Sequence, residues 1–432
     1  MRIGVLGHVG NQNLGDEALL GAVIQNVRRR YPDAEVIGFT RRPGDTRERH
    51  GIAAFPIHRT NGRAAPAPSA DSAAGAWERL GSLLKRVPLV RPLVRAARRI
   101  GRVVLGVPAE LGFLVRAYRN LRGTDLLLVA GSGQLNDYWE GPWGIPFTLF
   151  KWALLAHATG TKLALLSLGA GPLRTRVGKF FVKQTVRLAD YRSYRDDDSR
   201  RCVVALGVPG PHSVVPDLVF SLDVAAPTPP AASPLGRRRV VGINPMPFFD
   251  ERYYPESDPK VFGAYVERLA AFADWLVERE YTVRFFATQL FWDHGVIDRV
   301  RALMRAEPQA SGEGRVIARR IGSFDELVAT LDSLDLVVAT RYHGTLFAMI
   351  RLKPVVSIAY QRKSLELMRD MGQGAYAIAI DQLTLAGLQE RFLALERHSA
   401  EIVAAVRPKL PALRAALDTQ YDRAFKLLER VA

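Results

Sequence analysis

The sequence predicts an α/β protein made of two doubly wound domains that face each other across a cleft. Three observations carry this prediction. Short, continuous apolar runs alternate with helical stretches along the chain, a pattern typical of parallel sheets covered by helices on both faces. A proline-rich break interrupts the alternation near the middle, and 432 residues exceed the size at which one core keeps growing.

The first half of the chain supplies one alternating series. RIGVLG predicts a strand, EALLGAVIQNVRRRY a helix and AEVIGFT a second strand. After a Pro/Ala/Ser-rich loop at 60–77 and a basic segment at 78–122, the series resumes with DLLLVAGSG and ends at VVPDLVF. Further helices are expected at about 145–158 and 176–189. We therefore expect an N-terminal domain over 1–226.

A segment rich in proline and small residues, DVAAPTPPAASPLGRRR, marks the best domain boundary. We place a linker at 227–239 and a second domain over 240–400, where VVGINP begins a new alternating series. Residues 401–432 are expected to form one C-terminal amphipathic helix, interrupted by Pro408 and Pro411. Helices of the second series are expected at 259–279, 293–306, 324–333 and 363–372.

About half of the net charge of +17 lies in one segment. Residues 78–122 hold eleven Lys or Arg against two Glu, and PLVRAARRIGRVVL predicts a basic amphipathic helix near 93–105. Such a helix suits an anionic membrane surface or an anionic acceptor, although an ordinary surface helix explains the same pattern. Zinc-finger, RNP-type and basic–aromatic repeat motifs are absent from the sequence, so we do not expect nucleic acid as a partner.

The single cysteine and the absence of several known motifs exclude some kinds of covalent link and of catalytic or metal site. Cys202 is the only cysteine, which excludes an intrachain disulfide and a multi-cysteine metal cluster. The sequence contains no H-E-x-x-H or G-x-S-x-G, and its eight histidines are scattered, so no metal is expected. The start reads as a short strand, and no apolar run reaches the ~18 residues of a membrane span. We expect a cytoplasmic protein, which the basic helix would allow to associate peripherally with the inner face of the membrane.

The stretch VGNQNLGDEALL joins the first strand to the first helix. Asp16 and Glu17 fall in the first helical turn, where the helix dipole favours acidic residues. Capping explains these carboxylates but not the asparagines and glycines before them. The loop has neither the G-x-G-x-x-G pattern nor the Lys-Ser/Thr pair of a phosphate-binding loop. Carboxylates and amides at a cleft instead suit sugar hydroxyls, which they can hydrogen-bond or deprotonate.

Two further stretches follow expected strands. AGSGQLND places Gly133, where a backbone can approach a ligand closely, and Asp137 at a strand exit, although an ordinary turn explains the same pattern. In YRSYRDDDS, Arg195 precedes a helix start and could offer a fixed cation to an anionic ligand. The alternative is an arginine paired with a neighbouring aspartate, and the acidic residues after it are ordinary first-turn residues.

The most informative stretch is DLVVATRYHGTLFAMIRLKPVVSIAY. After a buried strand come Arg341 and His343, and then Gly344 and Thr345 open an apolar helix. A guanidinium and an imidazole beside free helix N–H groups form an anion-binding corner. An imidazole can act as acid or base near neutral pH, although a lone histidine at a strand end is usually structural. Further polar groups follow the next strand: Tyr360, Arg362 and Lys363.

Together these stretches resemble the polysaccharide pyruvyl transferase family. The matching elements are GNQNLGDEALL, GSGQLND, the YRDDDS segment, VVPDLVF with Asp217, and TRYHGTLFAMIRLKPVVSIAYQRK, in that order over most of the chain. Ser132 stands where the family commonly has another glycine, and the 60–77 loop and the basic 78–122 segment lie outside the pattern.

The resemblance implies a GT-B fold, with two Rossmann-like domains and an active site in the cleft between them. It also implies transfer of a pyruvyl group from phosphoenolpyruvate to two hydroxyls of a sugar in a cell-surface polysaccharide or its precursor. The product is a cyclic ketal, and phosphate is released. Phosphoenolpyruvate is then a co-substrate, no cofactor is expected, and the acceptor is compatible with a lipid-linked saccharide.

On this basis the donor is expected in the C-terminal domain and the acceptor in the N-terminal domain. His343 is the expected acid, or the group that protonates the leaving phosphate, and Asp16 is expected to activate the acceptor hydroxyl. The expected donor-binding residues are Arg341, Arg195, Gly344, Thr345 and Lys363. The expected acceptor-binding residues are Asn11, Asn13, Gly15, Glu17, Gly133 and Asp137.

Two other functions remain open at this point. A GT-B glycosyltransferase that uses a nucleotide sugar shares the architecture and needs a carboxylate for the ribose, for which Glu366 is the nearest candidate. A non-catalytic saccharide-binding relative is the second alternative. The intact pair of Arg341 and His343 argues against it, because a binding protein has no need for both.

Overall fold

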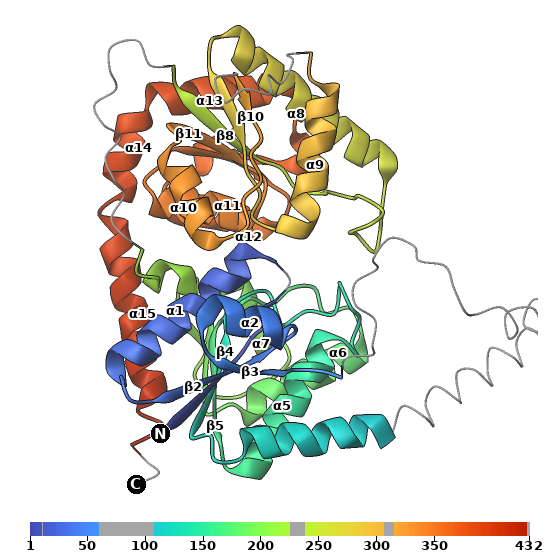
Figure 1. Cartoon of the computed structure of the whole chain (residues 1–432), viewed down its shortest axis with the longest axis vertical. Coiled ribbons are helices and arrows are strands. Elements are labelled where there is room, and N and C mark those ends of the chain that lie inside the picture. The colour runs from blue at the N-terminus through green and yellow to red at the C-terminus, as the bar shows by residue number, and fades with distance from the viewer. Residues whose placement is uncertain (11, 60–107, 225–237, 306–314, 430–432) are drawn as a thin grey trace, which may run out of the picture.

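The computed structural model describes residues 1–10, 12–59, 108–224, 238–305 and 315–429, which form two parallel sheets flanked by helices (Figure 1). Asn11, the basic helix expected near 93–105 and most of the proline-rich linker lie outside the described residues. The α/β architecture expected from the alternating pattern is confirmed, because every strand pair in both sheets is parallel.

The first sheet has seven strands in the order β3-β2-β1-β4-β5-β6-β7. Its central strands are buried on both faces, as the continuous apolar run of β4 predicts. The order reverses between β1 and β4, so a crevice is expected beyond their carboxyl ends. The strands are β1 (Arg2–Leu6), β2 (Glu35–Thr40), β3 (Ala53–Pro56), β4 (Leu126–Ala130), β5 (Lys162–Leu168), β6 (Tyr191–Tyr194) and β7 (Ser213–Val214).

Helices cover both faces of this sheet. Several begin at a residue whose side chain accepts a hydrogen bond from the first turn, as Asn13 does for α1 and Thr175 for α6. The helices are α1 (Leu14–Arg30), α2 (Pro43–His50), a helix over 108–121, α5 (Ile145–Thr159), α6 (Arg176–Leu188), α7 (Asp197–Val204) and the 3-10 turn η1 (Leu218–Ser221).

The second sheet has six strands in the order β10-β9-β8-β11-β12-β13, and its order reverses between β8 and β11. The strands are β8 (Val240–Asn244), β9 (Thr282–Phe285), β10 (Val316–Ile317), β11 (Leu336–Ala339), β12 (Val355–Ala359) and β13 (Ala377–Ala379). The helices are α8 (Pro259–Glu278), α9 (Leu290–Leu303), α10 (Phe324–Asp332), α11 (Tyr342–Ile350), α12 (Arg362–Asp370), η2 (Gly374–Tyr376), η3 (Ile380–Gln382) and α13 (Leu385–Arg397).

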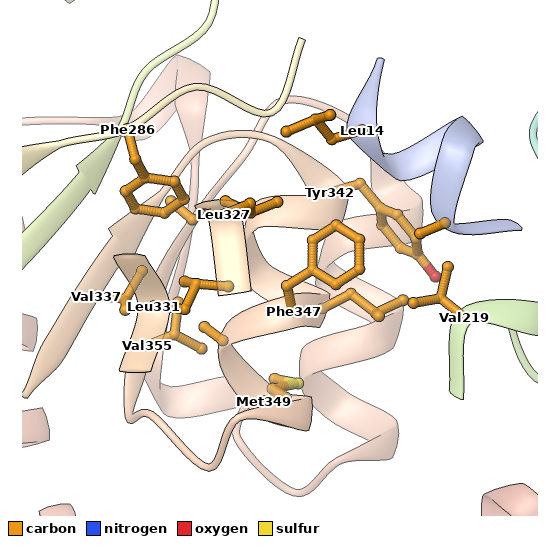
Figure 2. Close-up of a cluster of buried hydrophobic side chains, with 14 of the residues drawn as sticks. Leu14, Val219, Phe286, Leu327, Leu331, Val337, Tyr342, Phe347, Met349 and Val355 are labelled. Atoms are coloured by element: carbon orange, nitrogen blue, oxygen red, sulfur yellow. The ribbon is translucent and has the colours of Figure 1, made fainter. Parts of the chain in front are cut away.

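One hydrophobic cluster runs through both halves of the molecule. Figure 2 shows Leu14 of α1 and Val219 of η1 packed near Tyr342 and Phe347 of α11. The second cluster lies on the other face of the first sheet and includes Trp152. Apolar packing therefore joins the two sheets where the crevices at their carboxyl ends meet.

The C-terminal chain returns to the first sheet. The helical stretch expected over 401–432 is interrupted at Pro408, as expected: α14 (Ser399–Val406) ends before this proline, and α15 (Lys409–Phe425) begins after it. Pro411 lies in the first turn of α15, where a missing N–H costs nothing. Gln420 of α15 hydrogen-bonds Ser193 of β6 and Ser167 of β5, which fixes this helix to the N-terminal half (Figure 1).

Candidate functional site

The cleft between the sheets holds two connected cavities. The first cavity has a volume of about 410 Å³ and is lined from both halves, by residues that include Asp16, Arg195 and His343. The second cavity, of about 850 Å³, shares Gly133, Arg195 and Lys363 with it, among other residues. Both volumes are in the range of small-molecule sites, and both lie beyond the carboxyl ends of the strands, where open α/β sheets bind ligands.

The VGNQNLGD loop joins the two halves. The backbone N–H of Leu14 donates to the carbonyl of Thr288 (2.8 Å), and Leu290 N–H donates to the Gln12 carbonyl (2.9 Å). Gly15 packs directly against the catalytic candidate on α11, because a Cβ there would lie 2.1 Å from Nδ1 of His343. Gly15 is therefore required for close packing, and its expected contact with an acceptor is not what the structure shows.

Asp16 faces the first cavity and is not the cap of α1. That function belongs to Asn13, whose Oδ1 accepts from Gly15 N–H (3.1 Å) while its Nδ2 donates to Oδ2 of Asp16 (2.9 Å). Burial raises the pKa of Asp16 to about 6, against the opposing effect of a hydrogen bond with Ser132. Both Asn13 and Asp16 line the first cavity, so the structure brings these two expected residues to the site.

Two carboxylates expected at the acceptor site point elsewhere. Glu17 is buried beneath the loop. Its Oε1 accepts a hydrogen bond from the Gly10 N–H (2.9 Å), and its Oε2 lies 2.9 Å from Nε2 of His50. Asp137 accepts from the backbone N–H groups of Arg174 and Thr175, both at 2.8 Å. Both carboxylates hold loops in place and line neither cavity, so their assignment as acceptor ligands stays a prediction.

Arg341 lines the first cavity, and its guanidinium is held by hydrogen bonds to neighbouring side chains. Its Nε and Nη2 donate to Oδ1 of Asp293 (3.0 and 2.5 Å), and its Nη1 donates to the hydroxyl of Tyr253 (3.1 Å). Asp293 is fully buried and also accepts from the N–H groups of Thr288 and Gln289. The guanidinium is thereby fixed in orientation and keeps N–H groups for an anion.

Helix α11 begins at Tyr342, with Arg341 as its N-cap, which is earlier than expected. Thr345 is consequently inside the helix, where its N–H donates to Arg341 carbonyl (3.1 Å). Gly344 packs against Asn244, because a Cβ would lie 2.1 Å from Asn244 Oδ1. Neither residue lines the first cavity, whereas Tyr342 and His343 of the same helix do, so the assignment of Gly344 and Thr345 as donor ligands stays a prediction.

The surroundings of His343 favour the neutral form of its imidazole. Burial lowers its pKa to about 4, and the nearby cations Lys363, Arg195 and Arg341 add to this effect. Asp217 acts in the opposite direction and raises the pKa of the imidazole. Nε2 of His343 is buried without a hydrogen-bond partner among the described residues. An anionic ligand in the first cavity would offset the three cations and allow the imidazole to take up a proton.

Arg195 and Lys363 line both cavities. The Arg195 side chain is buried, with Nε 3.3 Å from Oδ2 of Asp196 and Nη1 3.6 Å from Oδ2 of Asp217, and its guanidinium carbon lies 4.7 Å from the Tyr342 ring centre. Nζ of Lys363 lies 5.3 Å from the same ring centre. Burial, reinforced by the Arg195 charge, lowers the pKa of Lys363 to about 7. Both residues face the cavities as expected.

Several lining residues were not expected from the sequence. Arg41 and Arg42 follow β2 and line the first cavity, together with Tyr253, Gln289 and Trp292 of the second half. The arginines carry a recognisable signal, because they lie at the carboxyl end of a strand next to the point where strand order reverses. The other three lie in loops or in a first helical turn and lack such a signal.

The second cavity differs in composition. Its wall includes Tyr138, Trp139, Phe249 and Tyr254, whose rings contact one another with Trp139–Tyr254 and Phe249–Tyr254 centroids 5.0 and 5.2 Å apart. Carboxylates line it as well: Asp196, Asp198, Glu256, Glu366 and Asp381. Burial and the neighbouring Asp198 raise the pKa of Glu366 to about 7. Among the described residues, no three His, Cys, Asp or Glu are grouped so as to hold a metal ion.

Two parallel sheets with a shared cleft define a GT-B-like α/β fold, and solved structures share it. UDP-GlcNAc 2-epimerase from Neisseria meningitidis bound to UDP-GlcNAc matches with a TM-score of 0.57 and 10% identity, over 98% of this chain and 99% of that chain. A putative UDP-N-acetylglucosamine 2-epimerase from Listeria monocytogenes matches with a TM-score of 0.54 and 14% identity, over 97% and 98%.

The sequence itself identifies the family. The profile of polysaccharide pyruvyl transferases matches residues 13–362, which is most of the chain and includes Asp16, Arg195, Arg341 and His343. The protein belongs to the polysaccharide pyruvyl transferase family. No curated protein sequence matches the chain. The resemblance drawn from the motifs and the expected GT-B-like fold are both confirmed.

Proposed function

We propose that this protein transfers a pyruvyl group from phosphoenolpyruvate to two hydroxyls of a sugar, with formation of a cyclic ketal and release of phosphate. The observation that carries this proposal is the convergence of Arg195, Arg341, Lys363 and His343 on one cavity of about 410 Å³. Phosphoenolpyruvate bears a carboxylate and a phosphate within a few bonds, so it needs several fixed cations at short range.

The first cavity suits the donor. Arg341 is oriented by Asp293 and Arg195 by Asp196 and Asp217, so both guanidiniums are in place before a ligand arrives. Lys363, with a pKa near 7, gains charge when an anion binds beside it. Three cations that are costly to bury together are stabilised by a ligand that carries negative charge, which favours donor binding in the absence of acceptor.

His343 and Asp16 supply the proton transfers. His343, protonated once the anionic donor is bound, gives its proton to C3 of the donor and makes C2 electrophilic. A sugar hydroxyl forms a bond to C2 and loses its proton to Asp16, whose pKa of about 6 suits a base at neutral pH. The second hydroxyl then forms its bond to C2 as the C2–O bond to phosphate breaks, and its proton leaves with the phosphate.

The second cavity suits the acceptor. A pyranose ring has an apolar face of C–H groups that packs on aromatic rings, and its hydroxyls donate to carboxylates. Tyr138, Trp139 and Phe249 offer the rings, while Asp381 and Glu366 offer acceptors. A cavity of about 850 Å³ has room for more than one sugar ring. The boundary at Arg195 and Lys363 then brings the acceptor hydroxyls to the donor.

The test is an assay of phosphate release from phosphoenolpyruvate in the presence of saccharide acceptors, with the acceptor followed by mass spectrometry. Formation of the ketal adds the mass of pyruvic acid less one water, and this shift should appear only with both substrates. The variant His343→Ala should lose turnover and keep donor binding. Release of phosphate without any shift in acceptor mass would contradict pyruvyl transfer.

A second candidate is glycosyl transfer from a nucleotide sugar. One observation favours it: Glu366, the carboxylate expected near a ribose, does line the second cavity beside Arg362, whose Nε lies 3.3 Å from its Oε1. A solved protein of the same fold is bound to UDP-GlcNAc. Release of a nucleoside diphosphate from nucleotide sugars, with no phosphate from phosphoenolpyruvate, would select this function over the first.

A further inference from the structure

The helices beside the cavities carry an exposed apolar surface. Seven of the thirteen large exposed apolar side chains of the described residues lie on helix 108–121, on the segment before α5, on α5 and on α6. Three of the seven are Trp143, Leu111 and Phe180, which are 65%, 57% and 50% exposed. The other four are Val115, Tyr118, Leu154 and Val177. Apolar surface gathered in this way on one region marks an interaction site.

The helices that carry these side chains pack against one another. The Trp143 ring contacts Phe147 of α5 and Phe181 of α6, with centroids 5.1 and 5.3 Å apart, and Phe150 of α5 contacts Phe180 of α6. Helix 108–121 packs on α5 through Lys151, whose Nζ lies 5.1 Å from the Phe113 ring centre. Figure 1 shows these helices together at the end of the molecule that the first sheet forms.

The same helices are strongly basic. Glu110 is the only carboxylate in helix 108–121, α5 and α6, and it is ion-paired with Lys151. Six cations have no ion pair within the described part of the chain, whereas α1 pairs Arg29 and Arg30 with α15. They are Arg116, Arg119, Arg176, Lys179, Lys183 and Arg187. We call the seven apolar and six basic side chains the basic aromatic face.

We propose that the basic aromatic face binds the surface of a bilayer that contains anionic lipids. Exposed aromatic and aliphatic side chains flanked by Lys and Arg are the composition that inserts into a headgroup region. In the part of the chain that the structure describes, no helix is long and apolar enough to cross a membrane.

The face borders both cavities. Trp143 lies between Glu140 and Ile145, which line the first cavity, and Arg174, which lines the second, comes two residues before α6. A saccharide attached to a membrane lipid could therefore enter the second cavity while the protein rests on the bilayer. The proposal goes beyond the reaction, because membrane binding needs neither substrate.

The test is co-sedimentation of the full chain with vesicles of phosphatidylcholine, with and without ~30% phosphatidylglycerol. We expect binding only to the anionic vesicles, and release at high salt. The double variant Lys179→Glu and Arg187→Glu should lower the partition coefficient at least tenfold. Trp143→Ser with Phe180→Ser should lower it by a similar factor, because the apolar insertion is lost.

Matched controls lie on the second half of the molecule. Lys260→Glu with Arg268→Glu reverses two charges on α8, and Val261→Ser with Leu303→Ser removes two exposed apolar side chains. Both controls should bind vesicles within twofold of the wild type, and thermal unfolding should show that all four variants are folded. Unchanged binding by the α6 variant would place the interaction elsewhere and overturn the proposal. Light scattering should show whether the protein is a dimer. If it is, and if Trp143→Ser with Phe180→Ser dissociates the dimer, then the basic aromatic face binds a second copy of the chain and the membrane proposal is wrong.

Discussion

The two cavities of the cleft differ more than the two domains that build them. The first cavity is small and cationic, with Arg341 and Arg195 held by buried carboxylates, and the second is twice as large, with aromatic rings and several carboxylates in its wall. The sequence suggested donor and acceptor sides in separate domains. Yet Arg195 comes from the first half and Arg341 from the second, and both line the first cavity. Each cavity is therefore lined by residues of both domains, and the two cavities differ in the charge and type of the side chains that line them.

The largest effect that we expect from a substitution in the first cavity is that of His343→Ala, which tests whether this cavity carries out the proton transfer. His343→Ala should lower kcat by ~10²–10⁴-fold while the dissociation constant for phosphoenolpyruvate changes only a few-fold, because a proton donor is lost and the cations remain. Phosphate release and a donor-binding titration measure the two quantities. The exposed His398, changed to Ala, is the matched control and should match the wild type. A variant that retains full turnover would remove His343 from the mechanism.

Arg341 tests whether the first cavity alone recognises the donor. Arg341→Lys keeps the charge but loses the planar group that Asp293 and Tyr253 orient, so the donor KM should rise by ~10–100-fold. The acceptor KM should stay within twofold, as should both constants in the surface control Arg268→Lys. If the acceptor KM rose instead, the assignment of the two cavities would be reversed.

Tyr138 tests the second cavity by the same logic. Tyr138→Ala removes a ring from that wall only, so the KM of a soluble acceptor should rise by ~10-fold and the donor KM should not change. Tyr376→Ala, a partly exposed tyrosine outside both cavities, controls for general loss of an aromatic side chain. An effect on the donor constant alone would show that the second cavity does not hold the acceptor.

Asp16 gives the smallest effect, and it depends on pH. Its pKa is raised to about 6 in the fold from an unfolded value of 3.8, so its ionisation opposes folding increasingly as pH rises from about 4 to 6. Asp16→Asn should therefore increase the free energy of unfolding by ~1–2 kcal/mol at pH 8, allowing for partial exposure, and by much less at pH 4. Urea denaturation at the two pH values measures this. An equal increase in the free energy of unfolding at both pH values would mean that the fold does not raise the pKa of Asp16.

The pattern of strands and the order of motifs predicted most of the fold and the centre of the site. Arg341 and His343 were found because a buried strand ends directly before them, and that position fixes them at the cleft. Asp16 and Glu17 show the limit of this reasoning. Adjacent helix positions point about 100° apart, so one carboxylate faces the cavity and the other lies under the loop.

Long-range packing explains what the sequence could not provide. Gly15 and Gly344 look like ligand-binding glycines until the structure shows His343 and Asn244 against them. Asp293 stands 48 residues before Arg341, and nothing local connects the two. The aromatic wall joins residues near 138 to residues near 250, which only the docking of the two halves brings together.

The way in which α15 and the N-terminal loop cross between the halves has a consequence for the integrity of the chain. The paired backbone of Gln12–Leu14 with Thr288–Leu290, the shared apolar cluster and the contacts of Gln420 bind the two halves without the covalent linker. Proteolytic nicking between 225 and 237 should thus yield two fragments that co-elute, melt in a single calorimetric transition and keep a complete cleft. We therefore expect the two halves to unfold together, as one cooperative unit, whether or not the linker between them is intact.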